Sequence, residues 1–160
     1  MSSGKKYFEI RLLAGVSNLF ATVGIRSSLP SVGDLGYTSG VGWDSGSGDV
    51  YKDGLLVSAT GVTGGFNPFI NVALEFTGAN MLVWMGRNNT WFSSGDPSTG
   101  ANPLTTMALG TYYAAVGNNF HGLNVGCQCQ LLATEDSQFY AAPTGFTAAA
   151  LDTVTWGPVP

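Results

Sequence analysis

The sequence predicts an all-β fold, a two-sheet antiparallel β-sandwich. Short segments in which every second residue is apolar recur along the chain, and this is the period of half-buried strands. Clusters of Gly, Asn, Asp and Ser separate these segments at short spacing, as turns between antiparallel strands do. No segment keeps a helical period over several turns. Because 160 residues fit one domain, we assign residues 1–150 to the sandwich and residues 151–160 to an extended C-terminal tail.

The centre of the predicted sandwich is a hairpin within residues 69–84. Apolar side chains alternate along residues 69–76, residues 77–80 break the pattern as a turn, and Leu82 and Trp84 resume it. We expect the same alternation to continue through the turn and the N-terminal strand to join this hairpin. The predicted common core is then built by Phe8, Ile10, Ile70, Val72, Leu74, Phe76, Leu82 and Trp84.

The first two strands are expected near the N-terminus. Residues 7–13 alternate loosely, and residues 20–25 return after a turn at 15–18. Gly24, inside the second strand, leaves room for the close approach of another backbone. Residues 26–48 are rich in Ser, Gly and Asp, so we expect an irregular surface connection there.

Turn signals continue along the chain. Asp53 and Gly54 form the strongest short-range hairpin signal, within residues 50–57. Residues 87–91 predict a polar turn at the end of the central hairpin. Residues 93–103, with the sequence SSGDPSTGANP, predict a surface loop that tolerates change.

The last two predicted strands are residues 111–116 and 123–132. Cys127 and Cys129 in the second of these would point to the same face of the strand, in a geometry unsuited to a disulfide between them. We therefore expect two reduced, mostly buried thiols without a bound metal.

The composition indicates an unusually neutral surface. Hydrophobic residues make up 44% of the chain and charged residues 10%, against roughly 25% charged in an average soluble domain. With 23 glycines and a mean hydropathy of +0.17, such a surface suits a protein that buries much of itself against neighbours. The alternative is a weakly charged monomer rich in small residues.

Charge and hydropathy also exclude partner classes. The net charge is −4 and the basic residues are scattered, so we expect no nucleic-acid binding. No apolar run approaches the ~20 residues that span a bilayer, so we expect no membrane insertion. Residues 1–7 lack the apolar segment of a secretory signal, so we expect none to be removed.

The sequence holds no convincing catalytic or metal-binding pattern. Asp44, Asp49 and Asp53 lie in turn-rich stretches, where Asp is favoured for its side-chain hydrogen bonds to the backbone. Glu75 lies on the polar side of the central strand and receives no catalytic role. His121 is the only histidine, and no nucleophile motif accompanies it. We expect no catalysis and no cofactor.

Several motifs occur in a familiar order: SSGKKYFEI, ATVGI, GWDSGSGDVYKDG, INVALEFTGANMLVWMGRNN, TYYAAVG and PTGF. In this the chain resembles a SPRY domain, in particular the compact versions found in bacteriophage and prophage proteins. The resemblance implies a two-sheet sandwich of lectin-like, jelly-roll shape whose end loops present a shallow protein-binding surface, without catalytic residues. Two departures concern the late loops: Asn88-Asn89 replaces the usual Asn-Gly, and residues 125–129 replace the usual close of the late strand.

These observations favour a non-catalytic structural or accessory virion protein of a bacteriophage, assembled in the bacterial cytoplasm. Its expected partners are other capsid or tail proteins, with many copies or a homo-oligomer in the particle. The alternative is a receptor-binding or carbohydrate-binding module of a tail fibre with a host-surface receptor as partner, and an enzyme acting on glycans ranks last. The candidate contact residues are Tyr37, Trp43, Trp91, Phe92, Phe120, His121 and Trp156.

Overall fold

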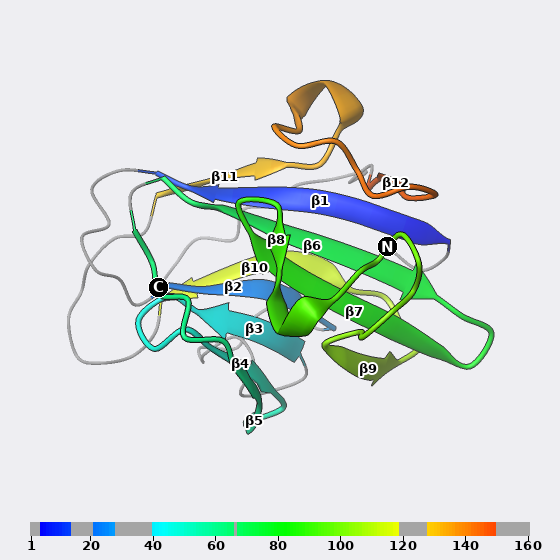
Figure 1. The fold of residues 1–160 in the computed structure, drawn as a ribbon, viewed down its shortest axis with the longest axis horizontal. Helices are drawn as coiled ribbons and strands as arrows, with labels where there is room; N and C mark the ends of the chain where they lie inside the picture. The colour runs from blue at the N-terminus through cyan, green and yellow to red at the C-terminus, as the bar shows by residue number, and fades with distance from the viewer. Residues whose placement is uncertain (1–3, 14–20, 28–39, 66, 119–127, 150–160) are drawn as a thin grey trace.

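The computed structural model describes residues 4–13, 21–27, 40–65, 67–118 and 128–149, which form two β-sheets packed face to face (Figure 1). Over this part of the chain the regular structure is strands and two short 3-10 turns, η1 (Phe92–Ser94) and η2 (Glu135–Ser137). The predicted all-β sandwich is therefore confirmed. None of the described helices is long and apolar enough to cross a membrane.

The first sheet has seven strands and is centred on the predicted hairpin. The order β11-β1-β6-β7-β8 is extended by β12 beside β1 and by β9 beside β7, and the β1–β12 pair alone is parallel. Its strands are β1 (Lys5–Leu12), β6 (Phe69–Phe76), β7 (Asn80–Arg87), β8 (Thr90–Trp91), β9 (Thr105–Ala108), β11 (Cys129–Leu132) and β12 (Thr147–Ala148).

The second sheet has five strands in the order β10-β2-β3-β4-β5, all antiparallel. Strand β5 is at one edge of this sheet. The strands are β2 (Ala21–Arg26), β3 (Gly40–Asp44), β4 (Asp49–Lys52), β5 (Leu55–Ala59) and β10 (Tyr113–Asn118).

The core between the sheets confirms the predicted phase of β1 and β6. Alternate residues of these two strands point inward and are buried: Phe8, Ile10, Leu12, Ile70, Val72 and Leu74. Phe76 is partly buried against the same core. The second sheet supplies its own inward row, which includes Val23, Ile25, Val41, Trp43 and Val50.

The predicted phase of β7 is wrong. Leu74 pairs with Val83 and Phe76 with Met81, so the odd-numbered residues of β7 share a face with the even-numbered residues of β6. The reason is that four residues, 77–80, separate the paired positions, and an even number of intervening residues reverses the parity. Met81, Val83 and Met85 therefore face the main core, whereas Leu82 and Trp84 do not.

Leu82 and Trp84 belong to a second apolar cluster, on the outer face of the first sheet. Trp84 is buried there together with Tyr7, Ala73 and Phe146, and Leu82, Trp91 and Ala142 pack against them. Part of this sheet is therefore buried on both faces. The simple alternation of apolar and polar residues does not hold for strands of this kind.

The expected irregular connection at 26–48 is wrong at its C-terminal end. Strand β3 pairs along β2, and Val41 and Trp43 are buried. The pairing depends on Gly24, as predicted, because a Cβ there would collide with the carbonyl oxygen of Val41. Alternating glycines hide the period of β3, since Gly40 and Gly42 add no side chains to its second face.

The predicted turns at Asp53-Gly54 and within residues 87–91 are confirmed, whereas the predicted turn at 15–18 lies outside the described residues. Asp53 and Gly54 connect β4 to β5 with φ values of 49° and 84°, the left-handed backbone of a two-residue hairpin turn. Asn88 and Asn89 connect β7 to β8 with φ values of 49° and 62°. Asparagine tolerates this region, so the Asn-Asn departure from the motif preserves the turn.

The late strands match the prediction where the structure describes them. Strand β10 covers the C-terminal part of the expected 111–116 segment and extends to Asn118, and β11 covers the end of the expected 123–132 segment. Residues 119–127 and the predicted tail, residues 151–160, lie outside the described residues. Cys129 carries a free, half-buried thiol, and Cys127 lies outside the described ranges.

Candidate functional site

The structure describes three of the candidate contact residues, and two of them are buried. Trp43 is fully buried, and its indole Nε1 donates to the Val62 carbonyl oxygen at 3.1 Å. Phe92 is also buried and stacks on Trp43 with 6.2 Å between ring centroids. Both rings lie in the core of the sandwich, where large aromatic residues often pack, and Phe92 also borders the groove described below. Trp91 is half-buried and keeps an accessible edge. The other candidates, Tyr37, Phe120, His121 and Trp156, lie outside the described residues.

Trp91 lines a hollow of the described surface, which we call the Arg87 groove. The groove has a volume of about 560 Å³ and lies between residues 58–62 and the β7–β8 hairpin with η1. Its lining combines hydroxyl, amide and apolar groups with one cationic side chain, that of Arg87. The lining residues are Ser58, Ala59, Thr60, Val62, Arg87, Asn88, Thr90, Trp91, Phe92 and Ser93.

Hydrogen bonds fix the hairpin wall of the groove. The Asn88 side-chain oxygen accepts from the Phe69 amide at 2.9 Å, and the Asn88 amide donates to the Phe69 carbonyl at 2.8 Å. The Asn89 amide donates to the side-chain oxygen of Asn71 at 2.7 Å. The turn is therefore held to β6 at both residues, and the wall is rigid.

The rim of this wall carries backbone strain. Ser93 and Ser94 both adopt a φ of 54°, in the left-handed region that side chains with a Cβ disfavour. Such conformations cost of order 1 kcal/mol each and cluster at functional sites. Ser93 is also one of the lining residues, so the strain lies at the groove.

The opposite wall is tied to the second sheet. The Thr60 hydroxyl donates to the Gly48 carbonyl and accepts from the Val62 amide at 3.1 Å. Trp43, from the core, holds the Val62 carbonyl. One side-chain hydrogen bond, between the hydroxyls of Ser58 and Ser93 at 2.9 Å, crosses from this wall to the other.

Arg87 is the charged residue of the groove. It pairs with Ile70 and follows Met81, Val83 and Met85 in the inward phase of β7, so its side chain lies where the row of core residues ends. Its Nε atom is buried and has no hydrogen-bond partner. Among the described residues one ion pair is present, Lys5 with Glu75 at 3.2 Å, and Arg87 has no carboxylate partner.

Gly65 fits the Arg87 side chain closely. A Cβ at Gly65 would lie 2.6 Å from the Arg87 Nη2 atom, and Gly65 has a φ of 140°. Only glycine combines this backbone conformation with this approach. The guanidinium therefore rests against a backbone that leaves room for it.

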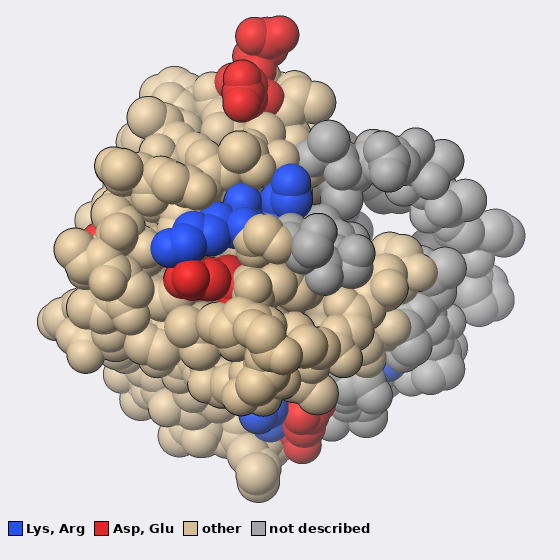
Figure 2. Space-filling model, turned by 90° about the vertical axis from the view of Figure 1, so that its right-hand side faces the viewer, with Lys and Arg blue, Asp and Glu red and all other residues tan. Residues whose placement is uncertain are grey.

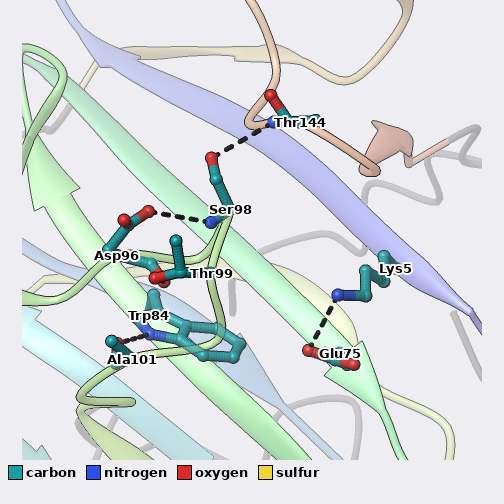
Figure 3. Close-up of polar contacts among 8 residues, drawn as sticks. All are labelled: Lys5, Glu75, Trp84, Asp96, Ser98, Thr99, Ala101 and Thr144. Carbon is teal, nitrogen blue, oxygen red and sulfur yellow. Dashed lines mark hydrogen bonds and ion pairs between the residues drawn. The ribbon is translucent and has the colours of Figure 1, made fainter.

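The loop at residues 93–103 lies over the outer face of the first sheet (Figure 3). The indole Nε1 of Trp84 donates to the Ala101 carbonyl at 2.8 Å, and the amide of Thr144 donates to the Ser98 hydroxyl at 3.2 Å. The Ser98 amide in turn donates to Asp96 at 3.0 Å. The predicted surface loop 93–103 therefore lies at the surface but is anchored on a buried tryptophan.

Beneath residues 138–140, also on this outer face, lies a buried polar network. The fully buried Glu9 carboxylate accepts from the Tyr7 hydroxyl at 2.6 Å and from the amides of Phe139 and Tyr140 at 2.8 and 2.9 Å. The Asn71 side chain donates to the Tyr7 hydroxyl at 2.8 Å. Burial and the adjacent Glu9 carboxylate raise the pKa of Tyr7. Because Glu9 is inaccessible and its bonds hold main chain, the network serves the fold.

An exposed aromatic group lies above this network. Phe139 is 66% exposed and stacks on Phe69 at 4.5 Å between ring centroids, and the Arg11 guanidinium lies 5.3 Å from the Phe69 centroid. A shallow hollow of about 300 Å³ lies beside it, between residues 135–142 and 146–148.

The described surface is poor in charge, as expected. On the face in Figure 2, charged side chains form a few small groups within a largely uncharged surface. The predicted side-chain bonds to the backbone are confirmed for two of the three aspartates, since Asp44 accepts from the Gly46 amide at 2.7 Å and Asp53 from the Gly40 amide at 3.0 Å. Asp49 instead begins β4 and accepts from the Tyr51 hydroxyl at 3.2 Å. No cluster of three metal-ligating side chains occurs in the described part of the chain. Burial raises the pKa of the Cys129 thiol.

Solved structures give the deciding comparison. A crystal structure of a human SPRY domain matches with a TM-score of 0.59 and 16% sequence identity, over 79% of this chain and 74% of that chain. The chain has the SPRY fold. The SPRY domain of human HERC1 also matches, with a TM-score of 0.45 and 14% identity, over 78% of this chain and 79% of that chain. No family model and no curated protein matches the sequence.

The SPRY fold confirms the architecture that the motifs implied, and the groove must be argued from this chain's own residues. Sequence reasoning found Trp91 and Phe92, which both line the groove, but missed Arg87 and residues 58–62. One signal was available for Arg87, which occupies the inward phase of an otherwise apolar strand once the register of β7 is known.

Proposed function

We propose that the protein is non-catalytic and works by binding other proteins through the Arg87 groove. The observation that supports this most is an unpaired arginine in a hollow with rigid walls and a strained rim. The lining holds hydroxyls, an amide and aromatic edges, but no acid, histidine or cysteine that would serve as a base, nucleophile or metal ligand.

The proposed setting is a bacteriophage particle, in which the protein decorates the capsid or is associated with the tail. The support is the resemblance of the motifs to phage and prophage versions of the SPRY domain, together with 10% charged residues. A neutral surface favours contacts that depend on buried area and shape. In a particle, many copies would add weak contacts by avidity.

A receptor-binding or carbohydrate-binding module of a tail fibre is the second candidate. The exposed Phe139 and the accessible edge of Trp91 favour it, since aromatic rings with nearby hydroxyls offer flat apolar surface next to polar groups. The two candidates differ in the molecule that is bound, and Phe139 does not line the Arg87 groove.

Photo-crosslinking in assembled particles tests the proposed function. A photoreactive amino acid replaces Thr90, an exposed lining residue, and in a control it replaces Thr106, an exposed residue of β9 outside the groove. We expect crosslinks to another virion protein from position 90 and far fewer from position 106. Equal labelling from both positions, or measurable turnover of a host glycan by the purified protein, would contradict the proposal.

A further inference from the structure

We infer that the Arg87 groove recognises one acidic side chain, Asp or Glu, carried on an extended segment of a partner protein. This inference rests on the proposed function, because it specifies the chemistry of the partner at the same groove. It makes Arg87 the residue that determines specificity.

The first step is the unpaired charge of Arg87. Its Nε is buried without a partner, and a guanidinium always carries its charge and five donors. Leaving a buried donor unsatisfied is unfavourable, and the described part of the chain offers no carboxylate that relieves it. A carboxylate from outside would accept two parallel hydrogen bonds from the guanidinium fork, which is the strongest match to its geometry.

The second step concerns the charge of the occupant. Arg87 is the single charged residue among those that line the groove. A phosphoryl group carries about −1.5 to −2 charges and is normally bound by clusters of arginine. One guanidinium balances one carboxylate, so the geometry favours Asp or Glu over a phosphorylated residue.

The third step concerns the molecule that carries the carboxylate. One wall continues from β5, an edge strand whose outer main-chain groups have no neighbouring strand among the described residues. Extended peptides bind beside such edges through main-chain bonds, with alternate side chains entering pockets. Ser58 and Thr60, two residues apart, add hydroxyls along this wall. The lining offers no carboxylate to accept bonds from sugar hydroxyls, which makes a protein segment the better occupant.

The fourth step concerns how well the site is formed before binding. Gly65 leaves room for the guanidinium, and the Asn88 and Asn89 bonds fix the end of β7. A guanidinium held in this way loses little freedom when it binds, so more of the interaction energy appears as affinity.

The test begins with a displayed library of random peptides selected on the immobilised full-length protein. An enriched peptide is synthesised with blocked termini, so that a terminal carboxylate cannot replace a side chain, and its dissociation constant is measured by calorimetry. Wild-type protein is compared with Arg87→Gln, Arg87→Lys and Lys6→Gln. The last variant removes the same unit charge from a residue that does not line the groove.

We expect the enriched peptides to share one acidic position. Arg87→Gln should weaken binding about ten- to a hundredfold, the range for a hydrogen-bonded charged group, and Lys6→Gln should leave it unchanged. Arg87→Lys should lie between them, because lysine lacks the fork. Replacing the acidic residue of the peptide by its amide should cause the same loss on wild-type protein and little further loss on Arg87→Gln. This peptide change keeps the test valid even if the Arg87 variants fold poorly.

Other outcomes would overturn the inference. These are the enrichment of no peptide, enriched peptides without a shared acid, acid-dependent binding that survives Arg87→Gln, and tighter binding of the phosphoserine version. Binding of oligosialic acid without binding of any acidic peptide would assign the groove to an anionic glycan instead. Crosslinks from position 90 to a virion protein would still support the proposed function if the acidic specificity failed, so the two failures are distinguishable.

Discussion

Glu9 links parts of the chain that are far apart in the sequence. Its two carboxylate oxygens together accept hydrogen bonds from Tyr7, Phe139 and Tyr140, and no water reaches them. In the alternation of this strand, Glu9 lies on the face opposite Phe8 and Ile10. It is buried because residues 138–142 cover this face, and neither composition nor periodicity indicates that cover.

Glu9→Gln should therefore destabilise the fold by about 1 to 3 kcal/mol, because one amide donor at residues 139–140 would face the NH₂ group of glutamine. Urea unfolding followed by tryptophan fluorescence measures the change. The exposed Glu135 provides the control, and Glu135→Gln should stay within about 0.5 kcal/mol of wild type. Equal effects of the two changes would mean that the network adds no stability.

Tyr7 predicts a dependence of stability on alkaline pH. Burial and the neighbouring Glu9 raise its pKa in the folded chain above the ordinary value of 10.0. The folded state therefore holds the phenolic proton more tightly than the unfolded state, so the stabilisation is complete below pH 10.0 and is lost as the pH rises above it. Unfolding free energies measured on both sides of this value should fall less steeply for Tyr7→Phe. An unchanged slope would contradict the coupling.

At the scale of elements, the strands that stand between clear turn signals were predictable from sequence. Strands β1, β2, β4, β5 and β6 follow from periodicity and from Asp53-Gly54. Strand β3 was missed because its alternate residues are glycines, and at Gly40 a Cβ would collide with the Ile25 carbonyl oxygen of β2. Alternation shows which residues of a strand share a face, but the number of residues in the turn decides which face points to the core. For this reason the core-facing residues of β7 were assigned wrongly.

The register of the central hairpin can be tested by two matched truncations. Leu74 is fully buried in the main core, so Leu74→Ala should cost roughly 2 to 5 kcal/mol. Leu82 is half-buried on the opposite face, so Leu82→Ala should cost clearly less. The two unfolding free energies decide the point, and similar losses would restore the phase that periodicity alone predicts.

At the scale of the whole molecule, the fold was more predictable than the site. The order of the motifs led to the SPRY architecture, because each motif marks a strand or a turn of the sandwich. The groove was not predictable, since residues 58–62 meet Arg87 through tertiary packing between two sheets. Trp43 and Phe92 illustrate the same limit, because a large aromatic residue at a strand end has the same sequence signal whether its ring fills the core or meets a partner.

The last prediction concerns the sequence from Trp156 to Pro160, outside the described residues. Pro158 and Pro160 lack the amide donor that a strand needs, so we expect this tail to lie extended against a neighbour in the proposed phage particle. Deleting residues 156–160 should weaken incorporation into particles while the isolated domain keeps its unfolding transition. Quantitative immunoblots of purified particles, with thermal unfolding of the same variant, measure both.

Salt provides the matching control for this deletion. A surface with so few charges gains little from long-range electrostatic attraction, so particle binding by the intact protein should survive moderate salt. The groove itself contributes one charged residue, and screening should weaken that contact only in part. Two results would contradict the prediction that assembly depends on buried area and on many weak contacts. These are normal incorporation of the shortened protein and release of the intact protein by moderate salt.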